Sequence, residues 1–137
     1  MNITVETVVN APVEIVWLTY NSPEHIVEWN TASEDWHTTS SSVDLREGGK
    51  FSSRMEAKDG SFGFDFAGTY TKLIENKLIE YSFGERTAKV EFYEVSNGVK
   101  VVVEFESEET HSIEQQQQGW QAILNSFKGY VEKTKSS

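Results

Sequence analysis

The sequence contains no cysteine. This absence excludes disulfide bonds, thiolate metal ligands and a cysteine nucleophile, and it fits a reducing compartment. Long apolar runs are missing as well, since no stretch approaches the roughly 20 residues that a transmembrane helix needs. Residues 1–4 lack the basic start and apolar stretch of a signal peptide. We therefore expect a cytoplasmic protein without membrane insertion.

Basic residues are few and scattered. Lys and Arg number 12 against 22 Asp and Glu, which gives a net charge of −10 and a pI near 4.7. Proteins that bind nucleic acids or anionic membranes rely on clustered basic side chains, and the sequence has no such cluster. We therefore expect no nucleic-acid partner.

The N-terminal part of the chain predicts one strand followed by two short helices. Residues 2–10 alternate between apolar and polar, as in a half-buried strand. Asn10 is a candidate N-cap and Pro12 suits a first helical turn, and the Ser-Pro-Glu motif at 22–24 is a second helix start. Residues 30–43 are polar, Ser/Thr-rich and without clear periodicity. We expect a long loop there, and loops of that length are usually functional or mobile.

Residues 44–106 predict an antiparallel meander of strands. Apolar side chains alternate through several short runs, and the Asp-Gly pair at 59–60 and the Asn-Gly pair at 97–98 are strong signals for two-residue hairpins. The two pairs separate runs that each have the length of one strand. Consecutive strands joined in this way form a single sheet.

The last segment predicts one long helix. Ser112 and Gln115 have the spacing of a capping box, and apolar side chains recur at the helical period up to Val131. The pattern supports about 20 helical residues, long enough to cross a small sheet. We predict one α+β domain over residues 1–137, in which a curved antiparallel sheet of about six to seven strands surrounds this helix.

Several stretches resemble a known family when taken together and in order. They are residues 10–17, 22–29, 35–37, 44–51 and 68–70, and Gly119 and Trp120 followed by Leu124, Phe127 and Tyr130. The chain resembles the START-like superfamily, also called SRPBCC. Within it, the chain is similar to the branch named for the C-terminal domain of the activator of Hsp90 ATPase. The resemblance implies the helix-grip (Bet v1-like) fold, a scaffold that holds lipids, hormones and polyketides and elsewhere docks on a chaperone.

Five large side chains are candidates for a ligand site. Trp29 and Trp36 flank the irregular segment, where the resemblance places the mouth of the cavity, and they suit an aromatic rim. Met55, Phe64 and Trp120 are candidates for the cavity wall. For all five, packing in the core is the alternative, because methionine and aromatic side chains fill core gaps equally well. Four other aromatic residues are expected to lie in the core: Trp17, Phe51, Phe66 and Phe127.

Two polar residues complete the candidate site. Gln116 lies inside the apolar stripe of the C-terminal helix, where a buried amide needs a partner from protein, water or ligand. With Arg54, it is a candidate for orienting a bound molecule. The alternative is a core glutamine that bonds to backbone or to Arg54.

No residue pattern requires catalysis or a metal. His37 with Asp35 has the form of a carboxylate–imidazole pair, but no serine elbow or cysteine accompanies it. The three histidines are dispersed and lack the spacing of zinc ligands. We predict no catalytic residue, no metal and no cofactor.

These features favour a non-enzymatic binding module for a small hydrophobic or amphipathic molecule, either lipid-like or an aromatic metabolite. A regulator of a chaperone ATPase, which implies a chaperone partner, is the alternative that the resemblance offers. An enzyme that uses the cavity as a reaction chamber, with Asp35 and His37 as the working groups, is the third hypothesis.

Overall fold

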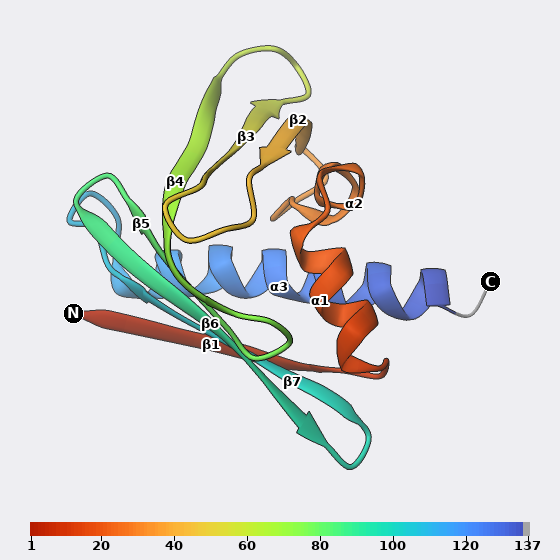
Figure 1. Cartoon of the computed structure of the whole chain (residues 1–137). Coiled ribbons are helices and arrows are strands. Elements are labelled where there is room, and N and C mark those ends of the chain that lie inside the picture. The colour runs from red at the N-terminus through yellow and green to blue at the C-terminus, as the bar shows by residue number, and fades with distance from the viewer. Residues whose placement is uncertain (136–137) are drawn as a thin grey trace.

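The computed structural model describes residues 1–135 and confirms the helix-grip arrangement (Figure 1). The elements in chain order are β1 (Asn2–Val9), α1 (Val13–Asn21), α2 (Pro23–Trp29), β2 (Trp36–Val43), β3 (Lys50–Ala57), β4 (Gly63–Ile74), β5 (Leu78–Phe83), β6 (Arg86–Val95), β7 (Gly98–Glu106) and α3 (Ile113–Lys135). Within residues 1–135, none of the helices has the length and hydropathy that a membrane span needs.

All strands lie in one antiparallel sheet with the order β1-β7-β6-β5-β4-β3-β2. The meander therefore runs along the sheet without a crossover, and β1 closes the far edge by pairing with β7. Inward-facing side chains alternate along each central strand; on β7 they are Val99, Val101, Val103 and Phe105, all buried. This alternation produces one apolar face for the helices to cover.

Helix α3 lies across that face and is anchored at its start by the predicted capping box. The Gln115 backbone N–H donates to Ser112 Oγ at 3.1 Å, and the Ser112 N–H donates to Gln115 Oε1 at 3.2 Å. Toward its C-terminal end, the helix buries Leu124, Phe127 and Val131. Phe127 contacts the rings of Tyr20 and Trp29 from the two short helices, at centroid distances of 5.1 and 4.9 Å. This end of the helix is therefore fully packed.

Residues 36–43, predicted to lie in a long loop, form strand β2 instead. The strand pairs with β3 and carries a bulge between Thr38 and Ser40. Its Ser and Thr side chains hide the apolar alternation that sequence reasoning relies on, because β2 is an edge strand with much of its surface in water. Only Thr38 is buried, and its hydroxyl donates to the Asn30 carbonyl at 2.6 Å.

Two local predictions were also wrong. The connection between β3 and β4 spans residues 58–62, so the Asp-Gly pair forms part of a longer loop rather than a two-residue hairpin. In that loop the Ser61 N–H donates to Asp59 Oδ1 at 2.8 Å, and Gly60 adopts a positive φ of 78°. Asn10 does not cap α1, whose N-cap is Pro12 without a side-chain hydrogen bond. The Asn10 N–H instead donates to Glu132 on α3 at 2.8 Å.

Candidate ligand-binding cavity

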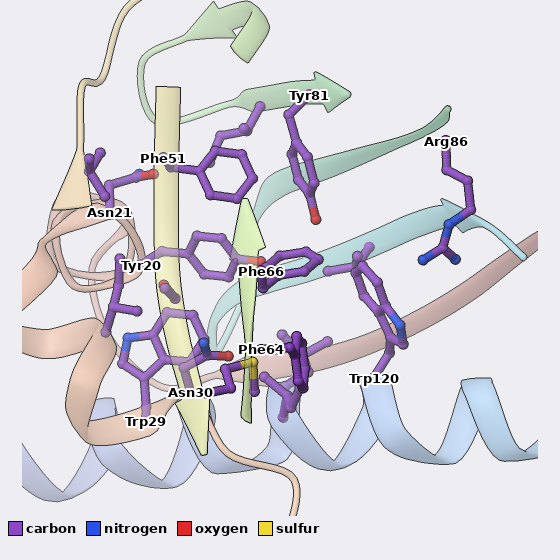
Figure 2. Close-up of a pocket in the computed structure, with 18 of the residues that line it drawn as sticks. Tyr20, Asn21, Trp29, Asn30, Phe51, Phe64, Phe66, Tyr81, Arg86 and Trp120 are labelled. Atoms are coloured by element: carbon purple, nitrogen blue, oxygen red, sulfur yellow. The ribbon is translucent and has the colours of Figure 1, made fainter. Parts of the chain in front are cut away.

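A cavity of about 420 Å³ lies between the concave face of the sheet, the two short helices and the N-terminal half of α3. Its walls are mainly aromatic and aliphatic (Figure 2). The lining residues from the helices and the loops beside them are Tyr20, Asn21, Ile26, Trp29, Asn30, Glu108, His111, Gln116, Trp120, Ile123 and Leu124. Those from the strands are Val43, Phe51, Ser53, Met55, Phe64, Phe66, Tyr70, Ile79, Tyr81, Arg86 and Val103.

The course of α3 explains why the space is open. The helix packs along β1 at one side of the sheet. Strands β2–β4 rise away from it at the other side, as Figure 1 shows. Trp120 bridges part of the gap: its ring stacks on Phe105 at 3.9 Å and reaches Phe66 at 6.0 Å. The side chains that α3 presents here leave the rest of the gap open.

The wall formed by β3 and β4 depends on Gly68. Phe51 lies opposite Gly68 in the strand register, and a Cβ at position 68 would lie 2.8 Å from the Phe51 ring and 2.4 Å from the Ser82 carbonyl oxygen. The missing side chain therefore lets Phe51 lie against β4. There it contacts Tyr70 and Tyr81 at centroid distances of 5.2 and 5.0 Å.

Three tyrosines bring hydroxyl groups to this apolar space. Burial and the neighbouring Asp44 carboxylate raise the pKa of Tyr70 to about 12. Burial likewise raises the pKa values of Tyr20 and Tyr81, and the proximity of the other tyrosines adds to the effect. Tyr20 is only half-buried by accessible surface because part of it faces the cavity. All three phenols therefore remain protonated at neutral pH.

Charged groups lie at one end of the cavity, beside Trp120. The Arg86 guanidinium lies over the Phe83 ring at 4.4 Å and donates to the Glu106 carbonyl at 3.0 Å. Glu108 pairs with His111 at 3.0 Å. Desolvation acts to raise the pKa of Glu108, but hydrogen bonds from the His111 backbone and ring outweigh it and leave this pKa below its usual range.

Gln116 holds the loop that carries these charges. Its Oε1 accepts from the Glu108 N–H at 2.8 Å, and its Nε2 donates to the carbonyls of Glu108 and His111 at 3.1 and 2.9 Å. The amide is thus bonded to backbone, as one of the two expectations had it, and yet the residue lines the cavity. Its polar atoms connect α3 to the β7–α3 loop.

Five of the seven residues proposed from the sequence line the cavity: Trp29, Met55, Phe64, Gln116 and Trp120. Trp36 does not line the cavity. Its ring contacts the lining residue Phe64 and the exposed Phe62, both at a centroid distance of 5.9 Å. Arg54 lies on the opposite face of β3 and forms ion pairs with Glu56 and Asp65. The pleat explains this position, because the neighbouring Ser53 and Met55 point inward.

The tyrosines and Phe51 were the main lining residues that sequence reasoning missed. Phe51 and Phe66 were expected to be core residues. Tyr70 and Tyr81 occupy inward positions of their strands. The sequence signal that could have revealed them is the tyrosine hydroxyl, since a phenylalanine would suit a closed core at these positions. A buried hydroxyl requires a partner, and these positions were open to the same reasoning that selected Gln116.

The carboxylate–imidazole pair considered at Asp35 and His37 does not reach the cavity. Neither residue is among the lining side chains, and both are exposed. Within residues 1–135, no three His, Asp or Glu side chains are grouped in a way that could hold a metal ion.

The sequence profile of the family described as Activator of Hsp90 ATPase homolog 1-like protein matches residues 10–132. The chain belongs to this family. Most of the secondary-structure elements fall within the matched range, including both walls of the cavity. No protein of curated function matches the chain.

Solved structures support the family membership. The solution structure of the AHSA1-like protein from Aeromonas hydrophila is 43% identical, with a TM-score of 0.93 over 100% of this chain and 96% of that one. A protein from Cytophaga hutchinsonii is 46% identical, with a TM-score of 0.84 over 98% of this chain and 94% of that one. A protein from Nitrosomonas europaea is 19% identical with a TM-score of 0.84, over 100% and 97% of the two chains, and shows the fold alone.

Proposed function

We propose that this chain binds a small hydrophobic or amphipathic molecule, without catalysis, in the cavity between the sheet and α3. The observation that carries the proposal is the cavity of about 420 Å³ with its largely aromatic walls. Ligand pockets in proteins commonly have volumes of roughly 300–1,000 Å³ and combine apolar walls with a few polar groups. The space has the size and the lining of such a pocket.

The energetic cost of the cavity supports the same conclusion. Void space in a protein core destabilises by about 24 cal/mol per Å³, so a dry cavity of this size would cost several kcal/mol. Typical domains have a net stability of roughly 5–15 kcal/mol. A bound apolar molecule would offset this cost and gain about 25 cal/mol for each Å² of its apolar surface removed from water.

Cavity-filling substitution on α3 provides the test. Ile123 lines the cavity, whereas Ile113 on the same helix is exposed and does not. Ile123→Trp places an indole in the space a ligand needs, so we expect at least about tenfold weaker binding of apolar probes, a loss of 1.4 kcal/mol. Ile113→Trp, the matched control, leaves affinity unchanged.

Amide NMR titration with a library of small lipids and aromatic compounds gives the readout. Shifts at lining residues in the wild type, weakened in Ile123→Trp, support the proposal. Shifts confined to exposed residues, or equal affinity in both variants, contradict it.

Docking on an Hsp90-type chaperone is the second candidate function. It is favoured by the family match and by an aromatic cluster of the half-buried Trp36 with the exposed Phe62 and Phe64. Phe62 is 62% exposed, which is unusual for a residue of its size. Pull-down of the cognate chaperone and its ATPase rate test this candidate. Loss of binding in Phe62→Ser supports it, and absence of both binding and rate change removes it.

A further inference from the structure

Three tyrosines from separate parts of the chain line the same cavity. Tyr70 on β4 and Tyr81 on β5 are direct partners in the strand register, so their side chains stand next to each other on the same face. Tyr20 comes from the opposite wall, on α1. Figure 2 shows the hydroxyls of Tyr20 and Tyr81 pointing into the space between sheet and helix.

The three hydroxyls have no hydrogen-bond partner within residues 1–135, although Tyr70 and Tyr81 are only 6% and 7% exposed. Every fully enclosed side-chain N or O atom in that part of the chain does have a partner. The tyrosine hydroxyls are therefore not sealed in the core but face the open volume of the cavity. An unpaired hydroxyl removed from bulk water costs about 1–3 kcal/mol, and phenylalanine would fill the same positions without that cost.

The charges around the hydroxyls favour a neutral guest over an anion. Among the described lining residues, Arg86 alone carries a permanent positive charge; one of its N–H groups donates to the Glu106 carbonyl, and its guanidinium lies over the Phe83 ring. The Glu108 carboxylate also lines the cavity and offsets this charge, and the Asp44 carboxylate lies close to Tyr70. An ionised carboxylate bound among the tyrosines would therefore meet at least as much negative as positive charge, which disfavours it in an apolar site.

We propose that Tyr20, Tyr70 and Tyr81 form a donor set that binds an uncharged acceptor oxygen, such as a ketone or other carbonyl, on a flat apolar ligand. This inference rests on the proposed function and specifies the ligand class. Phenol O–H groups donate, and a carbonyl oxygen has two lone pairs to accept. The aromatic side chains around them, among them Phe51 and Phe66, offer ring faces and edges to a flat molecule.

A matched set of three probes tests the donor set. The probes are methyl naphthyl ketone, isopropenylnaphthalene (in which CH₂ replaces the carbonyl oxygen) and naphthoate. They share shape and differ in the acceptor. Quenching of tryptophan fluorescence reports binding, because Trp29 and Trp120 line the cavity. In the wild type we expect the ketone to bind about tenfold more tightly than the alkene, the gain of one to two net hydrogen bonds, and naphthoate to bind weakest.

Removing the hydroxyls should remove the preference. In the triple variant Tyr20→Phe, Tyr70→Phe, Tyr81→Phe, ketone and alkene bind equally, while the alkene keeps its wild-type affinity. The control is Tyr93→Phe, which removes the hydroxyl of an exposed tyrosine that is bonded to Glu91 and is not among the lining residues. Urea unfolding separates the alternatives further: the unliganded triple variant should be as stable as the wild type or more so, because no protein hydrogen bond is lost.

Two outcomes overturn the inference, and they are distinguishable. If ketone and alkene bind the wild type equally, the donor set is wrong while the proposed cavity function stands. If none of the three probes binds, the cavity function fails and the inference fails with it. Should the triple variant not fold, the three single variants replace it; each should reduce the ketone preference, and an unchanged preference in all three contradicts the assignment.

Discussion

The two halves of α3 meet the same sheet with opposite results. The C-terminal half is closed: Phe127 and Val131 are fully buried against β1 and the two short helices. In the N-terminal half, Trp120 and Ile123 line a cavity of about 420 Å³ together with residues of β3–β5; this half is called the hollow half below. One continuous amphipathic helix therefore provides both a core and a binding surface, and the difference lies in the sheet, which curves away from the helix on one side only (Figure 1).

The two halves of α3 therefore have different roles: one half is buried in the core, and the other lines the cavity. Stability should depend mainly on the closed half, and ligand recognition on the hollow half. Substitutions that act on one half and spare the other can sharpen this division or break it.

The largest effect is expected at Phe127, the centre of the closed half. Phe127→Ala removes a fully buried ring that contacts Tyr20 and Trp29. We expect the free energy of unfolding to fall by about 3–5 kcal/mol, measured by urea denaturation. A loss below about 1 kcal/mol would show that the closed half is not tightly packed.

Alkaline pH should act on the hollow half. An unfolded tyrosine ionises with a pKa of 10.0, whereas Tyr70 in the folded protein has a pKa of about 12. Between these two pH values the tyrosine ionises more readily in the unfolded chain than in the folded protein. The stability that depends on the neutral Tyr70 phenol is therefore complete below pH 10 and is lost as the pH rises to about 12, which lowers the free energy of unfolding by about 2–3 kcal/mol. Urea denaturation across this range should show a steeper decline for the wild type than for Tyr70→Phe. Parallel curves would contradict the desolvation of Tyr70.

Phe66 is the counterpart of Phe127 in the hollow half. Its ring contacts Phe51 and Trp120 but is only half-buried and faces the cavity on one side, so its truncation removes less buried surface than Phe127→Ala does. Phe66→Ala should cost about 2 kcal/mol, roughly half the effect of Phe127→Ala, and should alter probe affinity. Equal losses at the two positions, measured under the same conditions, would remove the energetic distinction between the halves.

The smallest effect concerns the loop held by Gln116. Gln116→Leu keeps an apolar side chain in the stripe but removes the acceptor for the Glu108 N–H. We expect about fivefold faster hydrogen exchange at the Glu108 amide, from the loss of about 1 kcal/mol. The exposed neighbour serves as the control: Gln117→Leu should leave exchange unchanged. If neither variant changes the rate, the loop is held by other contacts.

The division between the halves also explains how far the sequence could predict the molecule. Strand alternation, the capping box at Ser112 and the helical stripe through Phe127 are local patterns, and the elements that follow from them are present in the structure. Strand β2 escaped prediction because its serines and threonines mask the alternation of an edge strand. Whether a given inward side chain contacts core or cavity depends on sheet curvature, which no local pattern records. For this reason Phe51, which packs against the core, was not also predicted to line the cavity, and Arg54 was expected to face inward.

Xenon titration monitored by methyl NMR tests directly whether the cavity is open, because xenon enters apolar cavities and the natural ligand need not be known. The methyl groups of Ile79, Ile123 and Leu124 line the cavity, whereas those of Val9, Val16 and Val131 are fully buried elsewhere. We expect saturable shifts in the first set and none in the second. Shifts of equal size in both sets, or no saturable shift at Ile123, would show that α3 closes on the sheet along its whole length.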